Sequence, residues 1–353
     1  MALVTIKKNS AQHIAMRLLA GLAVVIAVLW VPTKMATGDI DSMTNALALV
    51  IAASALNLVI GYTGLISIGH SAFFGVGTYA TGVLVSKYGW GHGWSMMFGA
   101  AIAFIIGCVV ALPALRIKGI YLALVTLAVA VLFPTLVKWP KLEWLTNGAR
   151  GTSGVRYDKL PSLPILGELK GRDGRAVFFY WFAILLVVIT VLVCRGIVKS
   201  RVGRALIAIR DNEIGAEVMG VNLAVTKTLV FGISAALTSL AGSLSVARTG
   251  VVTADGVNLT LLGSIIFLVV MVVGGAATLS GPIVGAFVYV WVDNYTRDAS
   301  ASGKGPIGWL FDWSAISPAT IVLSAALILL MFVAPDGVVG LIKRVSCRVV
   351  VVR

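Results

Sequence analysis

The chain has 353 residues, of which 59% are hydrophobic and 12% are charged, and its mean hydropathy is +1.00. A soluble domain carries about 25% charged residues, so the composition predicts an all-α, polytopic membrane protein. The formal net charge of +14 would suggest nucleic acid in a soluble protein. In a membrane protein it indicates basic cytoplasmic loops, so we expect membrane lipid and no nucleic acid as partner. Three widely separated cysteines predict neither a disulfide framework nor a metal site.

Ten apolar segments follow one another along the chain, and most approach the ~20 residues that cross about 30 Å of hydrocarbon. They cover 14–30, 43–60, 70–86, 95–115, 119–137, 176–194, 226–246, 259–275, 282–293 and 318–334. The first segment lacks a small-residue cleavage site, so we interpret it as a retained span rather than a signal peptide. Two segments are atypical, because 70–86 is rich in glycine and 282–293 is too short to span alone.

Basic residues predict the orientation of the spans. If the N-terminus lies inside, ten crossings also place the C-terminus inside, and the inner loops then hold fifteen basic and four acidic residues. We therefore predict one transmembrane domain over 1–353, with an extracytoplasmic loop at 138–175, a cytoplasmic loop at 195–225 between spans six and seven, and a basic cytoplasmic tail at 335–353. Residues 294–317 form a second expected outer loop.

The most polar stretch with helical character is Ser200–Asn222 in this cytoplasmic loop. Its sequence predicts two short helical pieces around a polar hinge. Asp211 or Asn212 can cap the second piece, and Gly220 can end it. Such a segment either lies on the lipid surface or docks on a partner protein.

A second stretch, Asn57–Gly77, contains too many glycines for an ordinary lipid-facing helix. Two interpretations are open: close helix packing, or a discontinuous segment that lines a translocation path. The candidate path residues are Asn57, Gly61, Gly64, Ser67, Gly69, His70, Phe73, Gly75 and Gly77. A third stretch, 273–285, predicts a helix break or a small-residue packing face at Gly274, Gly275, Gly281, Pro282 and Gly285.

Catalytic chemistry is not indicated by the sequence. The only histidines are His13, His70 and His92, and only His70 could serve a proton relay inside the membrane, where a hydrogen-bonded structural role is the alternative. The stretch 302–305 lacks the residues of a phosphate-binding loop. We therefore expect no cofactor on this chain, and an ATP-driven role would place ATP and Mg²⁺ on separate ATPase chains.

Taken together, these stretches resemble one family. GYTGLISIGHSAFFGVGTYATGVL at 61–84, RVGRALIAIRDNEIGAEVMGVN at 201–222, FGISAALTSLAGSL at 231–244 and VGGAATLSGPIVGA at 273–286 are similar to the inner-membrane permease subunits of ABC importers for branched-chain amino acids, the LivM-type permeases. NGARGTSGV at 147–155 also resembles an outer loop of that family. The match covers roughly half of the chain, in blocks that occur in the expected order.

The resemblance implies a bacterial inner-membrane protein that moves Leu, Ile and Val by alternating access. It implies a heterodimer with a second permease, two ATPase subunits and a periplasmic or lipid-anchored binding protein. It also implies that a short cytoplasmic coupling helix docks on the ATPase. Ala216 and Gly220 match the motif of such helices, whereas the glutamate is displaced to Glu213. The implied coupling residues are Arg210, Asp211, Asn212, Glu213, Ala216, Glu217, Gly220 and Asn222.

Other functions remain open at this point. Close relatives of the family carry urea or short amides. A stand-alone ion- or proton-coupled carrier is a further alternative, because backbone carbonyls of broken helices can bind sodium. A membrane scaffold or enzyme is the third, although no nucleophile–base pair or metal cluster supports it.

Overall fold

The computed structural model describes residues 4–6, 35–116, 120–155, 171–302, 337–341 and 350–352. The eight longest helices are α2 (Thr37–Thr63), α3 (His70–Tyr88), α4 (His92–Arg116), α5 (Ile120–Val137), α7 (Gly171–Lys199), α10 (Leu223–Thr249), α11 (Leu261–Gly274) and α12 (Gly281–Ser302). The shorter elements are α6 (Glu143–Thr146), α8 (Arg201–Asp211), α9 (Glu213–Val218), three 3₁₀ turns at 140–142, 148–150 and 257–259, and the strands β1 (Val4–Ile6), β2 (Thr152–Ser153), β3 (Val251–Val252) and β4 (Val350–Val352).

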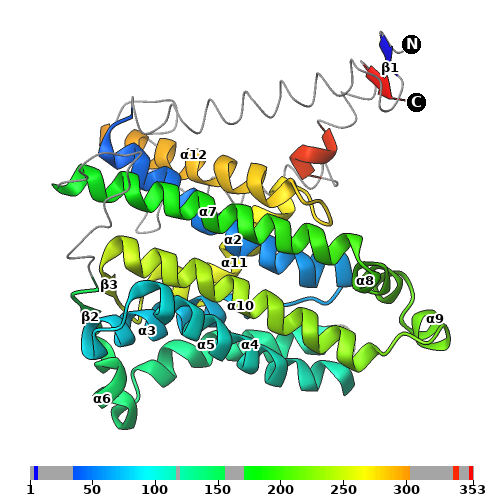
Figure 1. Cartoon of the computed structure of the whole chain (residues 1–353), viewed down its shortest axis with the longest axis horizontal. Helices are drawn as coiled ribbons and strands as arrows, with labels where there is room; N and C mark the ends of the chain where they lie inside the picture. The colour runs from blue at the N-terminus through cyan, green and yellow to red at the C-terminus, as the bar shows by residue number, and fades with distance from the viewer. Residues whose placement is uncertain are drawn as a thin grey trace.

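The long helices run lengthwise beside one another and define two ends of the bundle (Figure 1). Helices α8 and α9 project at one end, which we call the α9 end. Helix α6 and the antiparallel pair β2–β3 lie at the opposite end. The segment 138–155 and the segment 200–222, which the sequence predicts on opposite sides of the membrane, therefore lie at opposite ends. Strands β1 and β4 pair in parallel near the chain termini.

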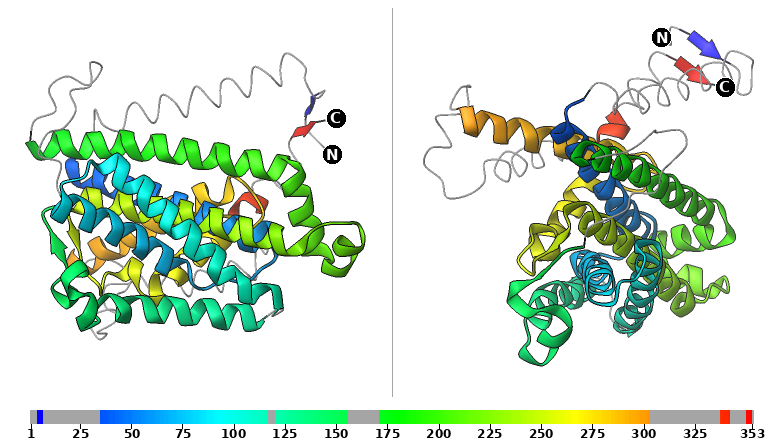
Figure 2. Two further views of the ribbon diagram at one scale, coloured as in Figure 1. Left: turned by 60° about the horizontal axis from the view of Figure 1, so that its bottom comes forward. Right: turned by 60° about the vertical axis from the view of Figure 1, so that its left-hand side comes forward.

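Of the helices long and apolar enough to cross a membrane, α2 is the most buried, followed by α10. In α4 and α7, about two thirds of the residues in the most apolar stretch are not buried. Figure 2 shows α7, in green, along one edge of the bundle. The exposed side chains on α4 and α7 include large apolar ones, such as Met97, Ile105 and Leu192. Exposed apolar faces of this kind are expected where a helix contacts lipid.

Four helices of the described part of the chain are long and apolar enough to cross a membrane, or five if the bent pair at 121–137 and 140–146 counts as one span. The fold is therefore helical and polytopic. Each of the eight expected apolar segments between residues 43 and 293 corresponds to one long helix. The expected spans 14–30 and 318–334 lie outside the described residues.

Several helix boundaries lie beyond the expected apolar segments, most clearly the end of α12. Helix α12 covers the expected apolar segment 282–293 and continues to Ser302, through part of the expected outer loop. Its last turns carry Asp293, Arg297 and Asp298, and a helix does not have to stop where its apolar run stops. Likewise α7 extends the expected span 176–194 to Gly171–Lys199. The expected tail 335–353 is described only at 337–341 and 350–352.

Candidate functional site

Helices α8 and α9 are two capped pieces that meet at Asn212. Ser200 Oγ accepts a hydrogen bond from the Val202 N–H at 3.1 Å and caps α8. Asn212 Oδ1 accepts one from the Gly215 N–H at 2.9 Å and caps α9. Of the two residues that the sequence offered as caps, Asn212 is therefore the one used. Gly220, with a φ of 84°, follows α9 in the left-handed conformation that favours glycine.

Helix α8 is fixed to the bundle by its buried face and by one arginine. Leu206 and Ile209 are buried, as the helical pattern of the sequence predicts. Arg210 donates a hydrogen bond from Nη1 to the carbonyl oxygen of Gly61 at 3.2 Å, in the last turn of α2. A cation is stabilised near the carboxyl end of a helix, where carbonyl groups remain free. Arg210 thus ties α8 to α2, and its Nε also contacts Asp211 at 3.1 Å.

Helix α9 presents apolar side chains away from the bundle. Ile214, Val218 and Met219 are 66%, 81% and 86% exposed, at the tip that projects in Figure 1. Ala216 is 4% exposed and therefore packs against its own chain. Among the coupling residues implied by the resemblance, Arg210, Asp211, Asn212, Glu217, Gly220 and Asn222 are exposed and Glu213 is partly exposed. The outward apolar residues did not enter the sequence-based set, although the spacing of Ile214 and Val218 (i, i+4) places them on one helical face.

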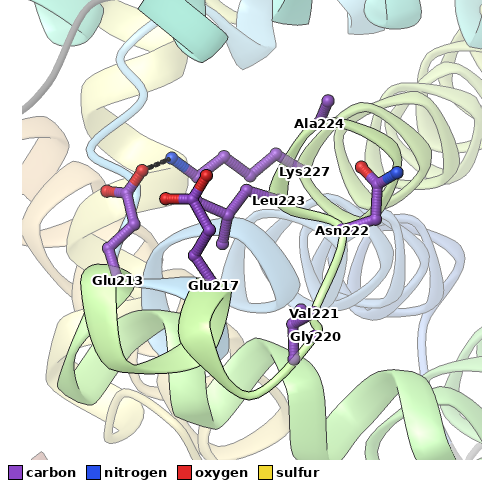
Figure 3. A pocket seen from close by; sticks show the side chains of 8 residues that line it. All are labelled: Glu213, Glu217, Gly220, Val221, Asn222, Leu223, Ala224 and Lys227. Atoms are coloured by element: carbon purple, nitrogen blue, oxygen red, sulfur yellow. Dashed lines mark hydrogen bonds and ion pairs between the residues drawn. The ribbon is translucent and has the colours of Figure 1, made fainter.

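A groove of about 540 Å³ separates α9 from the start of α10, and its walls carry two carboxylates and one amine (Figure 3). Glu213 and Glu217 both point toward Lys227. Lys227 Nζ lies 2.6 Å from Glu213 Oε1, and the side chains of the pair are 3% and 25% exposed. A buried lysine is costly without an anionic partner, so Glu213 stabilises the first turns of α10 as well as the start of α9.

His70, the only candidate for a proton relay in the predicted path, is completely buried and hydrogen-bonded at both ring nitrogens. Nδ1 lies 3.0 Å from Ser67 Oγ, and Nε2 lies 2.8 Å from Ser234 Oγ. Ser234 donates its own proton to the Ala55 carbonyl oxygen at 2.6 Å, so it accepts from Nε2–H, and Nδ1 accepts from Ser67. This neutral arrangement joins α2, α3 and α10 and favours the structural interpretation of His70. Phe73 is also buried and contacts the His70 ring edge-on at 5.6 Å.

The glycines of the predicted path stand at close contacts between helices. A Cβ atom at Gly69, Gly75 or Gly77 would lie 2.0–2.4 Å from an atom of another helix, such as the Ser239 carbonyl oxygen at 2.0 Å from Gly77. A Cβ atom at Gly61 would lie 2.6 Å from the backbone nitrogen of Ala277. Gly64 ends α2 with a φ of 73°. These contacts favour close packing over the path-lining interpretation, because small residues let helix backbones approach one another.

The third stretch forms a break between α11 and α12 at residues 275–280. Gly274 and Gly285 allow the two helices to approach, since a Cβ atom there would lie within 2.0 Å of a carbonyl oxygen of the other helix. Asn57 of α2 satisfies the exposed backbone of the break. Its Nδ2 donates to the Thr278 carbonyl oxygen at 2.8 Å, and its Oδ1 accepts from the Ala277 N–H at 2.9 Å. The structure therefore brings Asn57 and Gly61 together with the predicted break residues, which also include Gly275, Gly281 and Pro282.

Comparison with known proteins shows which family the chain resembles in sequence. Residues 39–334 match the family described as "Branched-chain amino acid transport system / permease component". The chain is 30% identical over 291 residues to the high-affinity branched-chain amino acid transport system permease protein LivM of Salmonella typhimurium, a match that covers 78% of this chain and 67% of the relative. It is 30% identical over 293 residues to LivM of Escherichia coli, with the same coverage.

A more distant relative is named for the import of a different molecule. The chain is 24% identical over 202 residues to the autoinducer 2 import system permease protein LsrC of Yersinia enterocolitica, which covers 56% of this chain and 53% of the relative. No solved structure matches the chain significantly. Because the family match spans most of the chain, and because the LivM relatives are 30% identical over 78% of it, the chain belongs to the branched-chain amino acid transport permease family.

Proposed function

We propose that this chain is the transmembrane permease subunit of an ABC importer that moves Leu, Ile and Val inward by alternating access. ATP hydrolysis resides on two separate ATPase subunits, a second homologous permease completes a heterodimer, and a periplasmic or lipid-anchored binding protein delivers the substrate. The observation that carries the proposal is the projecting helix α9 at one end of a chain of this family, where Ile214, Val218 and the following Met219 are exposed. An exposed apolar cluster rimmed by charge is typical of a docking surface.

The proposal includes a topology. About ten spans cross the bacterial inner membrane, with both termini inside, the 195–225 loop in the cytoplasm and the 138–175 loop outside. Support comes from the placement of the described parts of these loops at opposite ends of the bundle. Labelling of single cysteines from either side of the membrane tests it, at Val218 for the cytoplasm and at Trp144 for the outside.

The docking role of α9 is tested by substitutions on its outward face. Val218→Asp and Met219→Asp place a charge where an apolar contact is expected. They should weaken copurification of the ATPase by about tenfold or more, as hot-spot substitutions do. Val257→Asp, at an exposed residue of the opposite end, is the matched control and should leave copurification unchanged. Wild-type binding by the α9 variants would favour the alternative in which this loop lies on the lipid surface.

The substrate is tested by competition in the reconstituted complex. Leucine should compete with labelled valine for ATP-dependent uptake, and urea or a short amide should not. The substrate needs this direct test because the relative LsrC is named for a different molecule, autoinducer 2. ATP-independent uptake driven by a sodium or proton gradient in vesicles that contain only this chain would instead support the carrier alternative.

A further inference from the structure

The ion pair between Glu213 and Lys227 joins the projecting helix to a central helix of the bundle. Glu213 is the first residue of α9, and Lys227 lies in the second turn of α10. Nζ and Oε1 are 2.6 Å apart, and only 3% of the lysine side chain is exposed. Loss of one partner from such a pair is strongly destabilising, because the other charge is left in a poorly hydrated place.

Helix α9 is too short to hold its own position. It has six residues, far below the length at which an isolated helix is stable in water. Its polar cap comes from Asn212, and Ala216 provides its buried side chain. Ile214 and Val218 of α9, and Met219 directly after it, are mostly exposed. The contact with Lys227 is therefore the charged link between α9 and the transmembrane helices.

Helix α10 continues this link into the centre of the bundle. Ser234, two turns beyond Lys227, donates to the Ala55 carbonyl oxygen of α2 and accepts from His70 of α3. Ser243 donates to the Gly77 carbonyl oxygen at 3.1 Å and accepts from Thr81 at 2.9 Å. A displacement applied to Lys227 would thus reach α2 and α3 through the backbone of α10.

We propose that Glu213 and Lys227 are positioning residues, which hold α9 in a defined place on α10 and transmit its displacement to the transmembrane helices. The transmission part rests on the proposed function, whereas the positioning part concerns this chain alone. The two parts need separate measurements.

Positioning is tested by electron–electron distance measurements on the purified full chain in lipid nanodiscs, without any ATPase. The natural cysteines are replaced, and spin labels are attached at Val218 on α9 and at Leu185 on α7, which are both exposed. The wild type should give a narrow distance distribution and Lys227→Met a broad one. Lys227→Met keeps most of the apolar stem and removes the buried charge, and the Glu213 carboxylate that remains is 25% exposed and can be hydrated, so we expect the variant to fold.

Two further variants identify the pair rather than either residue. The double variant Glu213→Lys with Lys227→Glu reverses the charges and should restore the narrow distribution. Asp41→Asn removes the partner of Arg248 at the other end of α10, where the two side chains lie 3.7 Å apart. This matched control should leave the distribution narrow. A narrow distribution in Lys227→Met would overturn the positioning role.

Transmission is tested in the assembled transporter as the amount of substrate taken up per ATP hydrolysed. Lys227→Met should retain ATP hydrolysis but lower this ratio by about tenfold, a factor typical of coupling between linked sites. The charge-reversed pair should recover most of the ratio. A wild-type ratio in Lys227→Met would overturn transmission. If the wild-type chain did not bind ATPases at all, the proposed function would fail while the distance measurement still decided the positioning role.

Discussion

Gly77 provides a direct test of whether the glycine-rich stretch packs helices or lines a path. In Gly77→Ala, the new Cβ atom of α3 would lie 2.0 Å from the Ser239 carbonyl oxygen and 2.6 Å from the Ser239 carbonyl carbon of α10. Both contacts involve backbone atoms, which rotamer changes cannot move. Ordinary van der Waals contact would require the two helices to separate locally by roughly 1.4 Å.

The expected loss of stability follows from this separation. Forcing an extra methyl group into a well-packed interior costs about 1–3 kcal/mol. The separation also stretches the two hydrogen bonds of Ser243, to Gly77 and from Thr81, and side-chain hydrogen bonds between membrane helices average about 0.6 kcal/mol each. We therefore expect Gly77→Ala to lower the free energy of unfolding by about 2–4 kcal/mol.

The assay is reversible unfolding of the purified chain in mixed micelles, followed by circular dichroism, together with uptake by the assembled transporter. Gly196→Ala is the matched control, because Gly196 lies in α7 and a Cβ atom there meets nothing within 4 Å. Alanine should be neutral there or stabilising by up to about 1 kcal/mol. If Gly77→Ala kept wild-type stability but lost uptake, the packing interpretation would be refuted and the path-lining interpretation supported.

Three other substitutions have expected outcomes that the same unfolding measurement checks. Asn57→Leu removes both hydrogen bonds to the break between α11 and α12 and should cost about 2–4 kcal/mol, since two partly buried backbone groups lose their partners; an unchanged midpoint would show that water replaces the amide. Ser234→Ala deprives both His70 and the Ala55 carbonyl of a partner and should cost about 1–3 kcal/mol, whereas Ser234→Thr keeps the hydroxyl and should cost less. Gly220→Ala should cost only about 1 kcal/mol, because its φ of 84° is strained for alanine although the space around it is open; a larger loss would indicate a contact of Gly220 with the rest of the chain.

The helices could be predicted from the sequence because hydropathy records the length of each apolar run. The capped pieces α8 and α9 were also predictable, since local residues such as Ser200, Asn212 and Gly220 end or begin helices by short-range hydrogen bonds. Helix boundaries such as the end of α12 could not be predicted in this way, because polar residues can continue a helix beyond its apolar run.

The partners of the candidate residues could not be predicted, because they come from distant parts of the chain. Asn57 contacts a residue 221 positions away, and His70 contacts one 164 positions away. A glycine in a sequence looks the same whether a helix or a cavity lies beside it. For α9, the family resemblance pointed to Ala216, but only the packing of the helix shows that Ala216 faces inward while Val218 faces outward.

The described contacts between helices differ between the interior and the ends of the bundle. In the interior, α2, α3 and α10 are joined by neutral hydroxyl, imidazole and carbonyl groups and by glycine contacts. Such contacts suit a medium in which apolar burial gives no drive for helices to associate. The described ion pairs lie at or near helix ends, as with Lys227–Glu213 and Arg248–Asp41. Glycine substitutions should therefore act mainly on folding, and charge substitutions at the α9 end mainly on how the bundle responds to what binds there.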